Sequence, residues 1–227
     1  MDRFPLPGLH PAGWPFIAGF AAATVVLGFI AQPLGWIGAI ATVWCAYFFR
    51  DPKRVPPEEP HLVVSPADGI ISAIAEAPPP AELDMGTAPR QRVSIFLNIF
   101  DVHVNRVPAD GVITKLAYRP GKFINAAFDK ASELNERMAI RMTTATGHDL
   151  AFVQIAGLIA RRIVCGLNVN QNVRAGERFG IIRFGSRVDI YVPPGHRLHV
   201  RVGQRAIGGE TVIAEALMAP DLAAPRS

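Results

Sequence analysis

The feature that most constrains this chain is a long run without charge near its beginning. From Phe4 to Phe49 the sequence contains no Lys, Arg, Asp or Glu. Pro33 divides the run into two segments, Trp14 to Ala31 and Leu34 to Phe49, both rich in Ala, Val, Ile, Leu and Phe. As helices they would be roughly 24 to 27 Å long, slightly shorter than the ~30 Å hydrocarbon layer of a bilayer. The run therefore predicts two short apolar helices that attach the chain to a membrane.

Two forms of attachment fit helices of this length: a short helical hairpin that spans the bilayer and a re-entrant insertion. A pair of buried helices in a soluble core is the alternative. A cleaved signal peptide is disfavoured, because the apolar run is too long, a second apolar segment follows at once and Arg3 is the one basic residue before it.

The residues that follow the run predict its orientation. Arg50-Asp51-Pro52-Lys53-Arg54 carries three cations within five residues, and basic residues beside apolar segments mark the cytoplasmic side. We therefore expect a membrane anchor at residues 1–50, a proline-rich linker at 51–61 and a domain at 62–227 on the cytoplasmic side of the cell membrane. The chain has a net charge of +4, and a modest positive charge favours an anionic lipid surface.

Beyond the linker the chain consists of short β-type runs separated by Gly and Pro. Apolar and polar residues alternate clearly from Val188 to Val192, and the spacing of the runs suggests a sandwich or a barrel. The pattern by itself predicts a mainly β domain. The expected strands are Leu62–Val64, Gly69–Ala75, Arg92–Leu97, Gly111–Tyr118, Ala139–Thr144, Leu150–Ile155, Arg162–Val164, Arg178–Arg183, Val188–Val192, Leu198–Val202 and Thr211–Ala214.

Two stretches lack periodicity and are predicted as loops, Ala77 to Arg90 and the polar segment Gly121 to Arg137; long ordered loops are disproportionately functional. The two cysteines, Cys45 and Cys165, show no CxxC or metal-ligand spacing, so we expect neither a disulfide framework nor a structural zinc. Nucleic acid is not an expected partner, because no basic stripe is interleaved with aromatic residues.

Two segments combine residues that can carry chemistry. Ser65-Pro66-Ala67-Asp68-Gly69 has the composition of a β-turn and offers Asp68 as a candidate catalytic residue. The segment from Asp101 to Pro108 follows an apolar strand and contains His103 and Arg106; active sites often place such groups at strand ends. Each segment also has a structural interpretation, as a turn and as the site of a buried histidine.

A third segment, Phe184-Gly185-Ser186, is a tight turn between two β runs if it is purely structural. A hydrolase nucleophile elbow is disfavoured, because GxSxG is missing and no helix follows. A Gly-Ser bond in a strained turn permits a different reaction, in which the Ser hydroxyl attacks the preceding carbonyl and forms an ester that then eliminates.

With these segments the chain resembles phosphatidylserine decarboxylase proenzymes of the short form found in many prokaryotes. The resemblance extends from about residue 14 to residue 214. Any one of the shared motifs is weak, but six in family order behind a membrane anchor are specific. The motifs are Phe48–Pro52, Ser65–Gly69, Asp101–Pro108, Gly121–Phe123, Asn135–Arg137 and Phe184–Ser186.

The resemblance implies a barrel-sandwich-like fold and a self-processing enzyme. The bond between Gly185 and Ser186 would break without hydrolysis, leaving a β chain of residues 1–185 and an α chain of residues 186–227 that form a heterodimer. Ser186 would become a covalent pyruvoyl group, the pyruvate cofactor of the reaction, and no metal is needed. The implied activity is decarboxylation of phosphatidylserine to phosphatidylethanolamine and CO2 in phospholipid biosynthesis.

The resemblance also implies roles for residues. Asp68 and His103 match the family positions that serve as orienting carboxylate and imidazole base for Ser186. Longer bacterial members carry a second His three residues after the first, where this chain has Arg106. His103 therefore serves both maturation and turnover, or Asp68 acts on Ser186 through water. His103 is also the expected proton donor to the substrate carbon after CO2 leaves.

The polar loop is expected to line the headgroup pocket. Lys122 and Arg137 are candidates for the phosphate and Asn135 for a carboxylate or amine. Arg106 is a further candidate for substrate binding. Two rival functions stay open: a pyruvoyl decarboxylase of another amine substrate, and a membrane-tethered β-sandwich binding module in which Gly185-Ser186 is a turn and nothing is cleaved.

Overall fold

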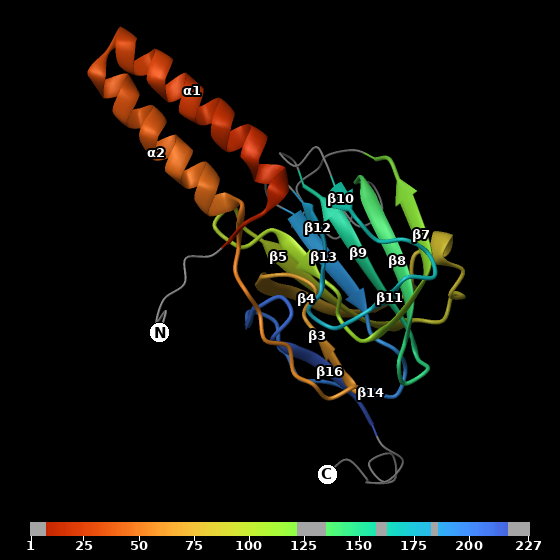
Figure 1. Ribbon diagram of the computed structural model, residues 1–227. Coiled ribbons are helices and arrows are strands. Elements are labelled where there is room, and N and C mark those ends of the chain that lie inside the picture. The colour runs from red at the N-terminus through yellow and green to blue at the C-terminus, as the bar shows by residue number, and fades with distance from the viewer. Residues whose placement is uncertain (1–7, 122–134, 158–162, 183–185, 218–227) are drawn as a thin grey trace.

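The computed structural model describes residues 8–121, 135–157, 163–182 and 186–217. A helical hairpin projects from one end of a β domain, and the chain enters the domain directly from the second helix (Figure 1). The cleavage candidate Gly185 and the headgroup candidate Lys122 lie outside the described residues, as does most of the predicted loop Gly121 to Arg137.

The hairpin consists of α1 (Trp14–Ile30), preceded by a short 3-10 helix η1 (Pro11–Gly13), and α2 (Gln32–Phe48). Pro33 lies in the first turn of α2, where its missing N–H breaks no helical hydrogen bond. The two helices pack closely, because a Cβ on Gly38 would come within 2.7 Å of the Thr24 hydroxyl. The predicted pair of apolar helices is confirmed, with ends that differ by at most two residues, while their attachment to a membrane stays a prediction.

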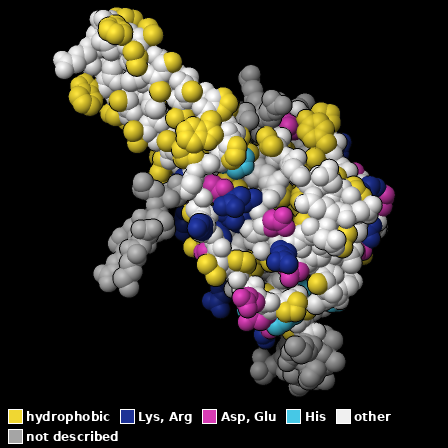
Figure 2. All heavy atoms as spheres, in the orientation of Figure 1, with side chains coloured by type: hydrophobic (Ala, Val, Ile, Leu, Met, Phe, Trp, Pro, Cys, Tyr) yellow, Lys and Arg dark blue, Asp and Glu magenta, His cyan; other side chains and the backbone are white. Residues whose placement is uncertain are grey.

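The hairpin exposes most of its apolar side chains. No residue of α1 is buried, and Phe29 at its end is 88% exposed. Figure 2 shows hydrophobic side chains over the hairpin, whereas charged side chains gather on the β domain. Among the described residues, the stretch Pro11–Ile30 is long and apolar enough to cross a membrane. The alternative of helices buried in a soluble core is therefore not what the structure shows.

The β domain is built from short antiparallel strands, which confirms the mainly β fold class. The strands are β1 (Gly8–Leu9), β2 (Arg50–Asp51), β3 (Leu62–Val64), β4 (Gly69–Ala77), β5 (Arg90–Leu97), β6 (Val104–Arg106), β7 (Gly111–Arg119), β8 (Arg137–Thr144), β9 (Asp149–Ala156), β10 (Ile163–Cys165), β11 (Asn172–Val173), β12 (Arg178–Ile182), β13 (Ser186–Tyr191), β14 (His196–Leu198), β15 (Arg205–Ala206) and β16 (Val212–Ala216).

The main sheet has eight strands in the order β11-β7-β8-β9-β13-β5-β4-β15 and curls into a half-barrel. Its strand β13 is central, hydrogen-bonded to β5 on one side and to β9 on the other. Strands β1 and β2 form a separate two-stranded sheet, and two three-stranded sheets, β10-β12-β6 and β14-β16-β3, pack with the main sheet. The apolar core between them includes Ile95, Phe152 and Ile190. A central strand is fixed by neighbours on both edges, so the residues of β13 are held firmly in place.

The strand prediction has one clear error and several omissions. Leu198–Val202 is wrong as a strand, because β14 ends at Leu198 and the chain then reverses in a turn where Gly203 adopts a φ of +86°. The predicted loop from Ala77 to Arg90 contains a short 3-10 helix, η2 (Ala81–Leu83). The five strands that were not predicted each have two or three residues, too few for a periodic pattern. They are β1, β2, β6, β11 and β15.

Candidate active site

Ser186 is the first residue of β13 and is completely buried. In the sheet it lies between Leu97 of β5 and Ala156 of β9. Its Oγ has no hydrogen-bond partner among the described residues. A buried hydroxyl without a partner lowers the stability of the fold, so this hydroxyl is a candidate for a chemical role.

His103 precedes β6 and is also completely buried. Its ring lies against the ring of Phe48 at the end of α2, with 4.1 Å between the centroids. Phe48 belongs to an apolar cluster that joins the hairpin to the domain and that contains Cys45, Phe48, Phe49, Val102, Val104 and Ile181. The base of the hairpin therefore covers the candidate catalytic histidine.

The surroundings of His103 fix its protonation state. The Nδ1 atom is 3.0 Å from the carbonyl oxygen of Asp101, which can only accept, so the proton of the neutral ring is on Nδ1. The Nε2 atom then carries the lone pair, and it has no partner among the described residues. Burial lowers the pKa of His103 to about 4. At neutral pH the ring is an uncharged base with a free nitrogen.

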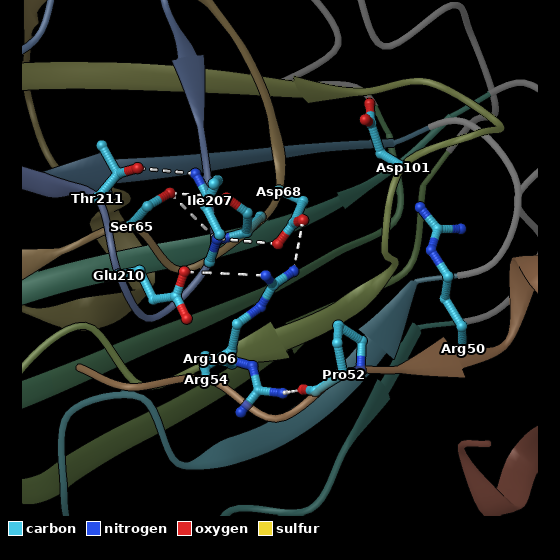
Figure 3. A network of polar contacts seen from close by, with 12 residues as sticks. Arg50, Pro52, Arg54, Ser65, Asp68, Asp101, Arg106, Ile207, Glu210 and Thr211 are labelled. Carbon is cyan, nitrogen blue, oxygen red and sulfur yellow. Dashed lines mark hydrogen bonds and ion pairs between the residues drawn. The ribbon is translucent and has the colours of Figure 1, made fainter. Parts of the chain in front are cut away.

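Asp68 lies in the turn between β3 and β4, and both of its carboxylate oxygens have partners (Figure 3). The backbone N–H of Gly208 donates to Oδ1 at 2.8 Å, and Arg54 Nη2 donates to Oδ2 at 2.7 Å. Burial raises the pKa of Asp68, while Arg54 and the Gly208 amide oppose that shift. No hydrogen bond joins Asp68 to His103 within the described part of the chain, so Asp68 does not orient the imidazole directly.

The backbone nevertheless brings the three predicted motifs together. The N–H of Arg106 donates to the carbonyl of Pro66 at 2.9 Å, which joins the Asp68 turn to the His103 segment. The N–H of Ile182 donates to the carbonyl of His103 at 3.4 Å. Since Ile182 precedes Ser186 by four residues, the His103 segment lies beside the strand that leads to the predicted cleavage site. Segments that are far apart in sequence thus meet at one end of β13.

Arg106 is almost fully buried and makes three hydrogen bonds to its own chain. Nη1 donates to the carbonyl of Gly176 at 2.9 Å, while Nη2 donates to Asp51 Oδ1 at 3.0 Å and to the carbonyl of Pro52 at 2.7 Å. These bonds tie the exit of the hairpin to the domain. The guanidinium also borders a basic groove, and its contact with the substrate stays a prediction. The cations of the groove are Lys53, Arg54, Arg106, Arg174 and Arg178.

Two predicted headgroup residues lie on the side of the site where β8 begins. Asn135 is buried, and its Nδ2 donates at 2.7 Å to the carbonyl of Ala156, the residue paired with Ser186. Arg137 makes two bonds to the Glu82 carboxylate, at 2.7 and 2.9 Å. Asn135 therefore contacts the residue that pairs with Ser186, whereas Arg137 is anchored to η2 through Glu82.

Sequence reasoning assigned no role to several residues that shape the site. Arg54 and Gly208 hold Asp68, and Phe48 covers His103. Asp101 is buried, accepts from the N–H of Asn98 and pairs with Arg205. Gly208 and Arg205 are more than 100 residues away from their partners, so no local pattern could reveal these contacts.

In the described part of the site, no group of three His, Cys, Asp or Glu side chains is placed to hold a metal ion. The site offers a buried hydroxyl and a buried neutral imidazole, each with a reactive atom free of internal hydrogen bonds. This combination suits a nucleophile and a base that act without bulk water.

Comparison with known proteins agrees with the motifs. Residues 41–214 match the sequence model of the phosphatidylserine decarboxylase family. The phosphatidylserine decarboxylase proenzyme of Paramagnetospirillum magneticum is 58% identical over 207 residues, which cover 91% of this chain and 86% of that protein. A family match over most of the chain, together with identity at this level, leads to one conclusion: the chain belongs to the phosphatidylserine decarboxylase family and is a decarboxylase.

Proposed function

We propose that this chain is a self-processing membrane enzyme that converts phosphatidylserine to phosphatidylethanolamine and CO2 in phospholipid biosynthesis. The observation that carries the proposal is the burial of Ser186 and His103, each with its reactive atom unpaired among the described residues, where three motifs of the family meet. The name of the similar protein, a phosphatidylserine decarboxylase proenzyme, supports both the substrate and the processing.

Maturation begins with Ser186. His103 Nε2 takes the proton of the Ser186 hydroxyl, and Oγ attacks the carbonyl carbon of Gly185 to replace the peptide bond with an ester. Loss of the Cα proton of residue 186 then expels the ester oxygen, so the β chain ends in the carboxylate of Gly185. The low pKa of His103 keeps the base uncharged before the reaction. Asp68 contributes through water or through Arg54 rather than by direct contact with the imidazole.

The position of residue 186 fits a pyruvoyl group. Since Oγ of Ser186 has no partner among the described residues, loss of the hydroxyl breaks no hydrogen bond there. The backbone of residue 186 stays fixed between β5 and β9. When formed, the pyruvoyl group supplies an electron sink for the carbon that loses CO2, as pyridoxal phosphate does elsewhere. His103 is the candidate that holds the proton to be returned to that carbon.

The cleaved chains would remain a heterodimer. Strand β13 of the α chain pairs along its whole length with β5 and β9 of the β chain. The Asp68 turn is also bonded to the α chain, through the Gly208 N–H and through the Gly209 N–H, which donates to the carbonyl of Ser65 at 2.7 Å. Separation would expose the apolar core, so association needs no covalent link.

The hairpin supports a location at the cell membrane with the β domain on the cytoplasmic side. A diacyl substrate stays in the bilayer, and the hairpin keeps the site beside it. Arg50 and Lys53 follow α2 directly, as expected for the cytoplasmic end of a membrane segment. The basic groove defined above favours an anionic lipid surface.

Headgroup recognition is proposed for the side of the site where β8 begins. Asn135 is the best-placed candidate, since its amide contacts the residue paired with Ser186. Lys122 and Arg137 are retained as candidates for the phosphate, and Arg106 as a further candidate for substrate binding. The two arginines would have to share their present partners, Glu82 and Asp51, with the substrate.

The test uses the purified full chain in detergent or vesicles with phosphatidylserine labelled in its serine carboxyl group. We expect labelled CO2 from the wild type and none from Ser186→Ala. Unlabelled free serine should not compete, because a soluble amine lacks the acyl chains that place it in the bilayer. Competition by free serine would favour a soluble amine substrate. A wild type that releases no labelled CO2 from phosphatidylserine, even without free serine, would contradict the proposal.

A further inference from the structure

A second pair of buried polar side chains lies next to Ser186. Asn105 of β6 and Gln154 of β9 are both completely buried, and Gln154 Nε2 donates to Asn105 Oδ1 at 2.9 Å. This bond joins the small sheet to the main sheet. Asn105 Nδ2 and Gln154 Oε1 have no partner among the described residues. In either consistent orientation of the two amides, the pair keeps one free NH2 group and one free oxygen.

The register places Gln154 of this pair on the same face of the sheet as residue 186. Ser186 pairs with Ala156 and Val188 pairs with Gln154, so Ser186 and Gln154 lie on the same face of neighbouring strands. Diagonal neighbours of this kind in an antiparallel sheet are roughly 7 to 8 Å apart. A glutamine side chain together with one water molecule can span that distance.

The fold leaves room for the amides. Gly180 of β12 lies opposite Asn105, and a Cβ on Gly180 would come within 3.0 Å of Gln154 Nε2. On the face of the sheet that carries Gln154, its neighbours Phe152, Ala156 and Val188 belong to the apolar core. Two amide groups with unsatisfied bonding capacity in such a core need a polar molecule to complete their hydrogen bonds.

The chemistry of the free atoms selects that molecule. A carboxylate or phosphate would be repelled by the free amide oxygen, and a cation by the free N–H. Water both donates and accepts, so it can satisfy both atoms at once. The pair is therefore suited to hold one water molecule.

We propose that Asn105 and Gln154 hold the water that attacks the α carbon of residue 186 during maturation, after the chain has broken. The inference rests on the proposed function, in which Ser186 is converted to a pyruvoyl group. After the chain breaks, residue 186 is an aminoacrylyl group with a CH2=C(NH2) end. Its CH2 carbon takes a proton, water adds to the α carbon and ammonia leaves, which gives CH3–CO. One water is consumed, one ammonia is released and no oxidant is needed.

An internal water is required because Ser186 has no exposed surface. The amide pair supplies it from the same face of the sheet, so its role is to position the attacking oxygen. In this step Asn105 and Gln154 act through the water and make no bond to residue 186.

The test replaces both amides with apolar side chains of similar shape, Asn105→Leu together with Gln154→Met. Since both partners of a buried hydrogen bond are removed, the change is expected to alter the unfolding temperature little. Full chains are synthesised in the presence of vesicles and quenched with sodium borohydride at successive times. Reduction turns a pyruvoyl end into a lactyl end that resists Edman degradation, whereas an end that still carries nitrogen becomes a sequenceable Ala.

The wild type should give a blocked α chain. The double variant should be cleaved after Gly185 but should yield a readable Ala at position 186, followed by Arg187. Ser94→Ala is the matched control, because Ser94 is equally buried with an unpaired Oγ but pairs with Asp189, which points to the opposite face from Ser186. It should behave as the wild type. If the double variant does not fold, Gln154→Met alone is read in the same way.

A folded variant that becomes blocked at the wild-type rate would overturn the assignment. So would a folded variant that stays whole, because the pair would then act in bond breakage. A wild type that is never cleaved would instead contradict the proposed function itself, so the two failures are distinguishable.

Discussion

The ring of Phe48, the last residue of α2, lies against the imidazole of His103 with 4.1 Å between the two ring centroids. The helical hairpin is therefore part of the environment of the candidate base as well as the proposed membrane anchor. The contact excludes water from His103, and this burial is the main cause of its low pKa. Changes at the base of the hairpin should consequently alter the chemistry of the site.

Phe48→Ala should raise the pKa of His103 from about 4 toward 6.5, because the imidazole gains access to water. The measurement is the pH dependence of the self-cleavage rate of newly synthesised chain in detergent, because His103 acts as the base in that step. The acid limb of the profile should move to higher pH in the variant. Phe29→Ala, at the exposed far end of α1, is the control and should leave the limb where it is. Identical acid limbs for wild type and Phe48→Ala would show that the ring does not govern the base.

His103 should also make stability depend on pH. Between pH 6.5 and about 4 the unfolded chain binds a proton that the folded protein does not, so the free energy of unfolding falls as the pH drops through that window. The full loss is about 3 kcal/mol. Denaturant unfolding of Ser186→Ala, which should remain one chain, measures it.

The raised pKa of Asp68 acts in the opposite direction, because its stabilising contribution is lost as the pH rises. The comparison must therefore be made against Ser186→Ala with His103→Gln added. That variant should lose the destabilisation between pH 6.5 and 4. An unchanged pH dependence would mean that His103 is not held neutral by the fold.

Gly69 positions the Asp68 turn and should not tolerate a side chain. It adopts a φ of +156°, and a Cβ there would lie 2.2 Å from the carbonyl oxygen of Phe96. Gly69→Ala should displace Asp68 and slow maturation, as followed by the fraction of cleaved chain on a gel. Gly86→Ala is a matched control, because Gly86 also has a positive φ but faces open space. Equal cleavage in both variants would contradict this account of the turn.

The strand that begins at Ser186 contains a buried ion pair on its other face. Arg187 Nε lies 2.8 Å from Asp189 Oδ1, and both side chains are almost completely buried. Asp189→Asn should destabilise the protein by about 3 to 5 kcal/mol, because the Arg187 charge loses this counter-charge in the core. Thermal unfolding of the Ser186→Ala chain is the measurement. Asp84→Asn, which removes an exposed pair with Lys115, should leave the unfolding temperature nearly unchanged.

The sequence was most informative where a pattern is local. The lack of charge and Pro33 predicted the hairpin, and the longer β runs predicted the strands of the main sheet. The short strand β6 was missed because buried Asn105 and Arg106 make it look like a polar loop. Their burial depends on partners in other elements, Gln154 and Asp51, which no local pattern can indicate.

The candidate site was predictable as a set of motifs but not as a geometry. Family resemblance named Asp68, His103 and Ser186, and the structure brings their segments together. It could not indicate that Asp68 binds Arg54 and the Gly208 N–H, or that His103 is oriented by a backbone carbonyl. These contacts join residues through the folding of distant segments, so they follow from the topology.

The most direct test of the account is the intact mass of the purified wild-type protein. We predict two chains, residues 1–185 and 186–227, the smaller one without a free α-amino group, and a single whole chain for Ser186→Ala. A fully active wild type that is one chain with an unmodified serine at position 186 would contradict it.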